Sequence, residues 1–360
     1  MVKINIYYVF RGYNMKKSAI FMAILAAVCY GISAPVSKLL LEEISPVFMA
    51  SLLYLGAGTG MFMVKLLKGG RGTQKEAKIS KKEIPYVMGM IVLDIAAPIF
   101  LMFGLTAAAP ANVSLINNFE IVATAVIALA FFKETIGKRM WVAIVLITVS
   151  SMMLSIEDFR AFSFSIGSVF VFLACICWGF ENNCTRMLSL KDPMQVVIIK
   201  GFGSGMGSLI IAAVTSEIIF RGTYIAFAML LGFVSYGLSI FFYIRAQREL
   251  GAARTSAYYA FAPFIGVALS LAVFGQGITV SFFAAVVIMM AGAYLAAFEK
   301  HEHSHIHKQL EHEHRHSHDD EHHAHTHDDP VEGEHSHMHT HEAMAHAHTH
   351  TPDIHHMHDH

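Results

Sequence analysis

The first 300 residues of the chain are dominated by apolar stretches, each long enough to cross a membrane as a helix. About 20 consecutive apolar residues span the ~30 Å hydrocarbon core of a bilayer. Because no water is available there to bond the backbone, such segments are expected to be α-helices. The sequence predicts ten of them, at Ser18–Ser37, Pro46–Leu67, Ile84–Leu105, Ala111–Phe132, Met140–Ile156, Ser163–Asn183, Met194–Ser216, Thr223–Ile244, Ala252–Phe274 and Thr279–Phe298.

The composition agrees with a membrane protein and argues against a soluble enzyme. Of 360 residues, 55% are hydrophobic and 15% are charged, where soluble domains average about 25% charged residues. All 23 histidines lie between His301 and His360, so imidazole catalysis is excluded from the apolar part. That part also contains neither an H-E-x-x-H helix nor a G-x-S-x-G turn, and no enzyme activity is expected. The cysteines fall in apolar stretches and indicate buried, reduced thiols at Cys29, Cys175, Cys177 and Cys184.

The distribution of lysine and arginine predicts the orientation, because basic residues are retained on the cytoplasmic side of a membrane. With the N-terminal segment 1–17 in the cytoplasm, 20 basic residues fall in cytoplasmic segments and only Lys38, Arg160 and Arg221 fall on the opposite side. Ten crossings return the chain to the cytoplasm. We therefore expect a multi-pass protein of the plasma membrane with both termini cytoplasmic.

The two halves of the apolar part repeat each other. Three features recur in the same order: the motif Leu25–Gly31 (LAAVCYG) as Leu173–Gly179 (LACICWG), Pro46 as Pro193, and the glycine run Gly56–Gly60 as Gly203–Gly207. The glycine runs are expected to let helices pack closely. Each half, 18–156 and 163–298, is then a five-helix unit, and an odd number of crossings inverts one unit relative to the other. Inverted repeats can exchange roles, which is the basis of alternating access to a site at mid-membrane.

The fold class predicted is an all-α integral membrane protein with ten transmembrane helices in two inverted five-helix repeats, followed by a disordered histidine-rich tail at 299–360. The recurring residues resemble the drug/metabolite transporter superfamily, EamA type. An A-x-x-x-[WY]-G signature opens each half, the second helix is rich in glycine, and the fourth ends in Phe132-Lys133-Glu134-x-Ile136. The resemblance covers about Ser18 to Phe298.

This resemblance implies ten helices, a central cavity, and export of small metabolites, amino acids or drugs. The chain departs from the family pattern in two places. Glu120-Ile121 stands where the second half has Ala262-Pro263, the family's usual proline, and the histidine tail is not part of the common pattern.

A few polar side chains fall inside the predicted helices, where a charge costs at least about 2.5–3.5 kcal/mol, so each indicates a partner or a wet cavity. Asn117, Glu120 and Thr124 have the spacing i, i+3, i+7 and would share one helix face. Tyr30 and Trp178 head equivalent positions of the repeat and are candidates to line a cavity. The candidate substrate or coupling residues are therefore Glu120, Asn117, Asp94, Lys200, Tyr30 and Trp178.

Two mechanisms are open for these charges. In one, Glu120 or Asp94 carries a proton between the two sides of the membrane. In the other, Glu120 pairs permanently with Lys200. A third hypothesis concerns the sixth helix, where the i, i+4, i+7 spacing would let one face bind a soft divalent ion through Cys177, Glu181 and Cys184.

From His301 onward, histidine alternates with small, polar or acidic residues, and only 11 of the last 60 residues are apolar. No core can form from this composition, so disorder is predicted. Imidazole binds Zn, Ni, Co and Cu ions, and a flexible strand can wrap one ion with several ligands. No cofactor is required, but a divalent transition metal is expected on His301, His303, His305, His307, His312, His314, His316, His318, His346, His348 and His350.

These patterns together predict a secondary transporter that exports a small polar solute or metabolite by alternating access. Two alternatives stay open: an exporter of divalent transition metals (Zn, Ni or Co) that the tail supplies with ions, and a membrane metal sensor without transport. The expected partners are the lipid bilayer and a small-molecule or metal-ion substrate. No nucleic acid is expected, and a homodimer is left open.

Overall fold

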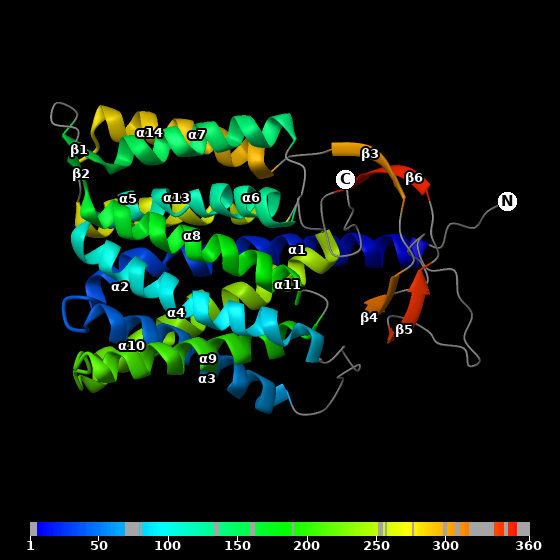
Figure 1. Cartoon of the computed structure of the whole chain (residues 1–360), viewed down its shortest axis with the longest axis horizontal. Coiled ribbons are helices and arrows are strands. Elements are labelled where there is room, and N and C mark those ends of the chain that lie inside the picture. The colour runs from blue at the N-terminus through cyan, green and yellow to red at the C-terminus, as the bar shows by residue number, and fades with distance from the viewer. Residues whose placement is uncertain are drawn as a thin grey trace.

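The membrane part of the chain is a bundle of long helices (Figure 1). The computed structural model describes residues 6–68, 79, 81–132, 137–158, 163–188, 191–250, 255, 258–275, 277–297, 301–306, 310–316, 335–341 and 345–350. The first half comprises α1 (Ile6–Gly31), α2 (Ser33–Leu40), α3 (Pro46–Lys68), the 3₁₀ turn η1 (Lys81–Glu83), α4 (Ile84–Ala107), α5 (Pro110–Ile116), α6 (Phe119–Phe132) and α7 (Lys138–Ser155). The second comprises α8 (Ile166–Arg186), α9 (Pro193–Val214), α10 (Gly222–Gly232), the π-helical segment η2 (Phe233–Leu238), α11 (Ser239–Leu250), α13 (Ala262–Phe274) and α14 (Val280–Ala297).

All ten expected spans coincide with helices, and the all-α membrane fold predicted from the sequence is confirmed. Among the described residues, seven helical stretches are long and apolar enough to cross a membrane, and α13 and α14 are shorter apolar helices. The first apolar span begins at Ser18 as predicted and runs to Leu40, and the helix that contains its start, α1, begins earlier, at Ile6. In the ninth span α13 begins at Ala262, Tyr258 and Tyr259 before it are also helical, and Ala252 lies outside the described residues.

Proline marks the start of several helices at equivalent places in the two halves. Pro46 opens α3 and Pro193 opens α9. Proline suits the first turn, since its fixed φ is helical and its missing N–H would have no partner there. The side chain of Asp192 also caps α9 by accepting a hydrogen bond from the Met194 backbone N–H at 2.9 Å.

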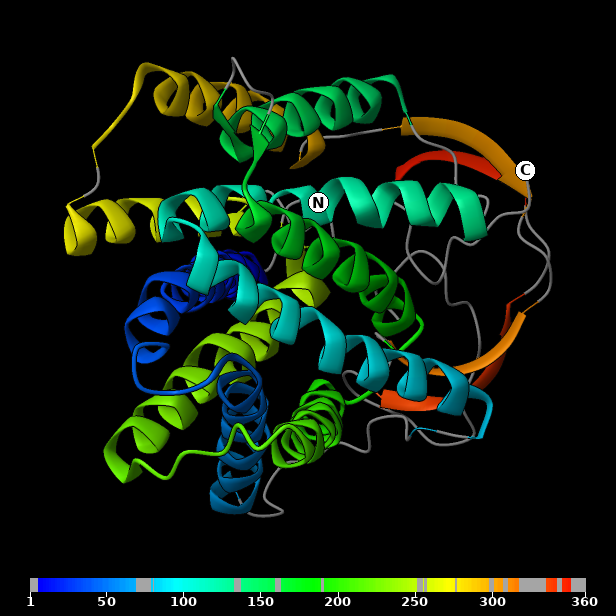
Figure 2. The ribbon, with the colours of Figure 1, turned by 60° about the vertical axis from the view of Figure 1, so that its left-hand side comes forward.

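The helices pack as pairs that join one half of the chain to the other. α3 lies along α9, α4 along α8, α1 along α11, and α7 along α14. The pairs α3–α9 and α7–α14 each join equivalent helices of the two halves. The pair α4–α8 in one half-to-half contact corresponds to the pair α11–α1 in the other, as the predicted repeat requires. Figure 2 shows α7 and α14 as a separate pair at one edge of the bundle.

The glycine runs lie where helices touch. A Cβ added at Gly201 of α9 would stand 2.4 Å from the backbone nitrogen of Gly58 in α3, and a Cβ at Gly56 would stand 2.1 Å from the Met229 carbonyl oxygen in α10. Gly203 instead makes room for the side chain of Ile91 in α4, whose terminal carbon would be 2.6 Å from an added Cβ, and the closest approach of backbones is at Gly201 and Gly56. Only glycine lets these backbones approach so closely, so the predicted packing role of the runs is confirmed.

Serine hydroxyls link neighbouring helices through main-chain carbonyls. Ser235 and Ser239 donate to Cys29 and Ala26 of α1, at 2.7 and 2.9 Å, and Ser150 of α7 donates to Ala285 of α14 at 2.7 Å. Such bonds contribute about 0.6 kcal/mol each in a membrane. The bundle is therefore held by close packing and by short polar contacts between helices.

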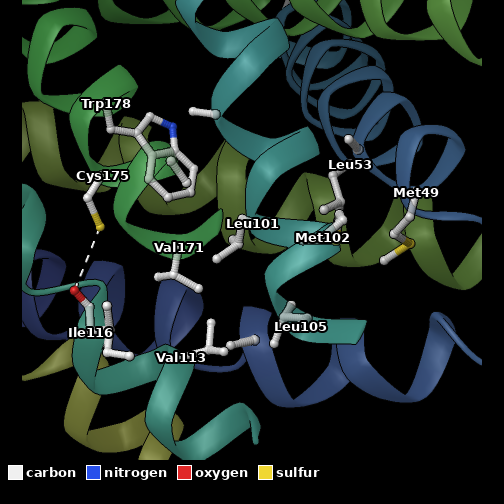
Figure 3. Close-up of a cluster of buried hydrophobic side chains, with 14 of the residues drawn as sticks. Met49, Leu53, Leu101, Met102, Leu105, Val113, Ile116, Val171, Cys175 and Trp178 are labelled. Atoms are coloured by element: carbon white, nitrogen blue, oxygen red, sulfur yellow. Dashed lines mark hydrogen bonds between the residues drawn. The ribbon is translucent and has the colours of Figure 1, made fainter. Parts of the chain in front are cut away.

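The core of the bundle is apolar, and so is its outer surface. Figure 3 shows Val171 of α8 beside Leu101 and Leu105 of α4, Met102 of α4 beside Leu53 of α3, and Cys175 of α8 pointing to the Ile116 carbonyl. The outer face carries many exposed large apolar side chains, among them Phe21 (64%) and Ile210 (61%). A surface of this kind suits contact with lipid and is unusual for a protein surrounded by water.

Four segments of the tail are strands, where disordered chain was expected. β3 (His301–Ile306) pairs antiparallel with β6 (Ala345–His350), and β4 (Leu310–His316) pairs with β5 (His335–His341). They lie at the end of the bundle where α1 begins (Figure 1). The every-second-residue alternation of histidine has the period of a strand. Two of the predicted metal ligands, His307 and His318, lie outside the described residues. Two further short strands, β1 (Ile156–Asp158) and β2 (Ser163–Phe164), join α7 to α8.

Candidate functional site

Among the described residues, the fourth helix is interrupted at Asn117–Asn118 between α5 and α6, and the ninth at the turn Ala260–Phe261 before α13. The first helix is irregular only at Ile32, between α1 and α2, where helical hydrogen bonds continue from the Ile32 N–H to the Val28 carbonyl and from the Val36 N–H to the Ile32 carbonyl. The fourth and ninth helices are equivalent members of the two halves. Interrupted helices at corresponding positions of an inverted repeat are a strong indication of a binding site, because irregular backbone is tolerated in a membrane only beside protein or a wet cavity.

A narrow pocket lies at these breaks. Its polar lining consists of Tyr30 and Ser33 on the first helix with Ser114 and Asn117 on the fourth, and Gly266 of α13 closes one side. Tyr30, which was predicted to line a cavity, and Asn117, a candidate substrate or coupling residue, both lie at this pocket. Trp178 does not line the pocket. It is 5% exposed and lies in the apolar core with Leu101 and Val171 (Figure 3).

A buried charge cluster lies between α4, α8 and α9. The ammonium Nζ of Lys200 is 3.0 Å from Asp94 Oδ2 and 3.0 Å from Glu181 Oε1. All three side chains are at most 8% exposed. The hydroxyl of Tyr54 donates to Asp94 Oδ1 at 2.8 Å, and the hydroxyl of Thr185 donates to Glu181. Two carboxylates thus share one ammonium, and hydrogen bonds occupy further oxygen lone pairs.

This cluster settles two of the hypotheses made from the sequence. The permanent pair of Glu120 with Lys200 is wrong, because Lys200 pairs with Asp94 and Glu181. The metal site at Cys177, Glu181 and Cys184 is also wrong. Glu181 is held by Lys200, and no group of three or more metal-binding side chains occurs among the described residues. The packing of α4, α8 and α9 brings the three charged side chains together. No local sequence motif connects them, because each lies on a different span.

The cluster has no charged counterpart in the other half. By the repeat, Glu181 corresponds to Ser33 and Lys200 to Leu53. Ser33 donates instead to the phenol oxygen of Tyr236 at 3.4 Å. The first half thus contributes Asp94 to the cluster and the second half Glu181 and Lys200, while the positions equivalent to Glu181 and Lys200 carry the uncharged Ser33 and Leu53.

Glu120 stands in the first turn of α6, just after the break. Its Oε1 accepts a hydrogen bond from Asn182 Nδ2 at 2.7 Å, and the same amide donates to Thr124 Oγ1 at 3.1 Å. Glu120 and Thr124 thus share one partner on α8, as their common helix face predicts. Asn117 belongs to the other side of the break, so the stripe of three polar residues is divided. Asn182 was not identified from the sequence, although an amide inside an apolar span is itself a signal.

Tyrosine rings form a chain through the centre of the bundle. Tyr54 and Tyr236 have ring centroids 5.2 Å apart, Tyr236 and Tyr30 6.2 Å, and Tyr30 and Tyr259 5.7 Å. Tyr243 extends the chain, 4.9 Å from Tyr259. Of these rings only Tyr30 was identified from the sequence. The chain connects the charge cluster, through Tyr54, to the pocket, through Tyr30.

Two ion pairs hold opposite ends of the bundle. At one end Arg221, which precedes α10, lies 2.9 Å from Glu43 in the connection between α2 and α3. At the other end Glu83, which precedes α4, lies 3.4 Å from Lys191 in the connection between α8 and α9. The two pairs occupy equivalent places of the inverted repeat, with the acid and the base exchanged. We call them the Arg221 latch and the Lys191 latch.

The Arg221 latch is reinforced by its neighbours. Glu217 Oε2 accepts from the Val47 backbone N–H at 3.1 Å, which caps the start of α3, and the Glu217 carbonyl accepts from the Ser45 hydroxyl at 2.6 Å. At the same end Lys38 donates to the carbonyls of Leu105 and Thr106, the last turn of α4. A lysine at a helix C-terminus complements both the free carbonyls and the helix dipole.

Comparison with known families finds a match to each half of the chain. The model of the EamA-like transporter family matches residues 17–156 and again residues 165–298. An uncharacterized transporter of Methanothermobacter thermautotrophicus is 23% identical over 291 residues, which cover 76% of this chain and 84% of that protein. The uncharacterized transporter YyaM of Bacillus subtilis is 22% identical over 210 residues, or 55% of this chain and 68% of that protein.

The fold also resembles solved structures. One crystal structure superposes with a TM-score of 0.58 at 14% identity, covering 78% of this chain and 96% of that chain. A resemblance at this level of identity concerns the fold alone.

Proposed function

The chain belongs to the EamA-like transporter family, and from this premise we propose that it is a secondary transporter that exports a small polar solute by alternating access. The observation that carries the proposal is the set of helix breaks around the pocket at Tyr30, Ser33, Ser114 and Asn117. They lie where the two inverted halves meet, which is where a site shared by both orientations belongs.

The two latches support alternating access. A transporter of this kind must close one end while the other opens, so each end needs contacts that form and break. The Arg221 latch and the Lys191 latch are ion pairs in equivalent places at opposite ends. Weak, partly exposed pairs of about 0.2–1 kcal/mol are suited to breaking in each cycle.

We assign the contact with the solute to Glu120. It lies in the first turn of α6 beside the break, in an apolar bundle where a carboxylate is costly, and its counterpart in the other half is Ala262. A charged side chain needed only for packing would be expected at the equivalent position of both halves. A charged side chain that occurs in one half only suits a single binding site shared between the two halves.

The experiment compares cells with and without the protein for growth and for accumulation of amino acids, drugs, amines and metals. Expression should lower the accumulation of a polar solute, and Glu120→Gln should abolish that export at normal protein abundance. The glutamine keeps the acceptor for Asn182 but removes the charge. Glu42→Gln, the same change at an exposed position in the α2–α3 connection, is the control and should export normally. Normal export by Glu120→Gln would refute the assignment, and no solute affected by expression would refute the transport proposal.

We further propose that the tail binds divalent transition metal ions. In the paired strands histidines stand opposite histidines, at His301 and His350, His303 and His348, His305 and His346, and again at His312 and His339, His314 and His337, and His316 and His335. Imidazole pairs of this density suit Zn and Ni. Because the ligand is neutral imidazole, binding should release protons and weaken below about pH 6.5.

Calorimetry on the purified chain tests the tail. The full chain should bind several Ni or Zn ions, and a chain truncated after Lys300 should bind none. Loss of metal resistance in cells on truncation, with solute export unchanged, would make the tail a separate metal buffer. Loss of metal export itself would favour the rival function, a metal exporter, for which the described membrane helices offer no three-ligand group.

A further inference from the structure

The pocket at the helix breaks has a chemical character that narrows the class of solute. We propose that it binds an ammonium group, so that the exported solute is an organic amine in its cationic form. The inference rests on the proposed function. It adds that the solute group bound here is positively charged and donates hydrogen bonds.

The pocket offers acceptors. The hydroxyl of Ser33 donates its hydrogen to Tyr236, and the hydroxyl of Ser114 donates its hydrogen to the Pro110 carbonyl at 2.8 Å. Both protons are therefore used inside the protein, and each oxygen presents only lone pairs to a ligand. A group that binds here must donate.

Asn117 supplies the second and independent observation. Its side chain is 8% exposed and lines the pocket, and its Oδ1 has no hydrogen-bond partner in the part of the chain that the structure describes. A buried acceptor without a partner costs about 1–3 kcal/mol, so it indicates a ligand that donates to it. Asn117 thus calls for a donor, and the oxygens of Ser33 and Ser114 have lone pairs that can accept from the same group.

The charges nearby favour a cation. No lysine or arginine lines the pocket, and Lys200, the buried basic side chain of the described bundle, is held between two carboxylates. Glu120 follows one turn after Asn117, and its backbone N–H donates to the Asn117 carbonyl at 3.1 Å. The solute's carboxylate or phosphate would therefore meet lone pairs and a negative charge, whereas an ammonium would be attracted to both.

Size and shape agree with this choice. The pocket has room for a group of about the size of one water molecule, which is also the size of an ammonium group. Tyr30 forms one wall, with Tyr236 and Tyr259 next to it at 6.2 and 5.7 Å between ring centroids. The face of a tyrosine ring attracts a cation and also suits an apolar remainder of the solute.

The test uses three probes with one skeleton: benzylamine, benzoate and benzyl alcohol. Each is titrated into the purified full-length protein in lipid nanodiscs, with binding read by calorimetry and by the shift in melting temperature. Benzylamine should bind saturably and raise the melting temperature, and benzoate should do neither. Absence of benzylamine binding, or benzoate binding as tight as that of the amine, overturns the inference.

Matched variants locate the binding. Asn117→Leu keeps the side-chain size but removes the acceptor, and it should weaken benzylamine binding by on the order of tenfold. Asn117→Asp keeps an acceptor and should bind at least as tightly. Asn118→Leu is the control, since Asn118 is 3% exposed but does not line the pocket, and its binding should be unchanged. An Asn117→Leu protein that binds like the wild type places the amine elsewhere and overturns the assignment.

The experiments distinguish failure of the ammonium inference from failure of the transport proposal. If cells expressing the protein export a carboxylate and no amine, the transport proposal stands and the ammonium inference falls. If expression changes the accumulation of no solute while benzylamine still binds at Asn117, the pocket is an amine site in a protein that does not transport, and the transport proposal falls.

Discussion

Lys200 is the one basic side chain classed as buried among the described residues, and its surroundings decide what its removal would do. Replacing it by methionine leaves Asp94 and Glu181 buried without their cation. Removing one partner of a buried pair costs about 3–5 kcal/mol. We expect Lys200→Met to lower the melting temperature and the yield of purified protein strongly.

A triple variant without these three charges shows whether the stability lost in Lys200→Met comes from charge or from side-chain packing. Lys200→Met combined with Asp94→Asn and Glu181→Gln removes all three charges together and should recover much of the lost stability, because no uncompensated charge remains. Thermal unfolding followed by tryptophan fluorescence measures both proteins. A triple variant as unstable as the single one would show that packing around Lys200, and not its charge, is what matters.

The sequence predicts part of this cluster. Asp94 and Lys200 are recognisable because charges in apolar spans need partners, and that need predicts a pair. Which carboxylate Lys200 meets depends on how α4, α8 and α9 pack, and hydropathy carries no information about contacts between spans. Glu181 and Glu120 look alike in the sequence, yet only Glu181 reaches Lys200.

At the scale of elements, the latches predict a response confined to one end of the bundle. Arg221→Ala removes the ion pair with Glu43 and should increase hydrogen exchange in the connections 41–47 and 215–221. Lys191→Ala should do the same for residues 187–192 and leave the first two connections unchanged. An exposed pair contributes at most about 1 kcal/mol, so the increase should be up to about fivefold. Equal changes at both ends in either variant would contradict a local latch.

The close contact of α3 with α9 predicts that adding a single methyl group there lowers the stability of the protein strongly. Gly201→Ala would place a methyl group 2.4 Å from the Gly58 nitrogen, so the helices must move apart. Overpacking of this kind costs about 1–3 kcal/mol or more, and we expect a lower melting temperature in detergent. Gly222→Ala is the control, because nothing lies within 4 Å of its added carbon. Similar stabilities of the two variants would argue against the close approach.

Hydropathy predicts that the helices exist, but it does not predict where they are interrupted. A window of apolar residues averages over an interruption, so Ala111–Phe132 and Ser18–Ser37 look continuous. Asn117-Asn118 is a recognisable signal in retrospect, since asparagine competes for backbone hydrogen bonds. The irregularity at Ile32 also has a signal in retrospect, because Pro35 has no N–H to donate to the Gly31 carbonyl and its ring crowds that carbonyl.

For the whole molecule, the charge asymmetry predicts a definite orientation. Reporters fused at Lys75 and at His339 should both be cytoplasmic, and one at Asp158 should be external. Reporter activity or protease protection in intact cells measures each. Finding Asp158 on the same side as Lys75 would be incompatible with ten crossings and with inversion of the halves.

The close contact at Gly58 and Gly201 also bears on how the two halves can move. No side chain stands between α3 and α9 at this point, so a change of their crossing angle would need no rotamer to flip and no cavity to open. The contact therefore has the mechanical properties of a pivot between α3 and α9, which lie at the edge of the bundle opposite α7 and α14 (Figure 1). A small rotation there becomes a large displacement at Arg221 and Lys191. Enlarging the pivot should slow opening toward both sides alike.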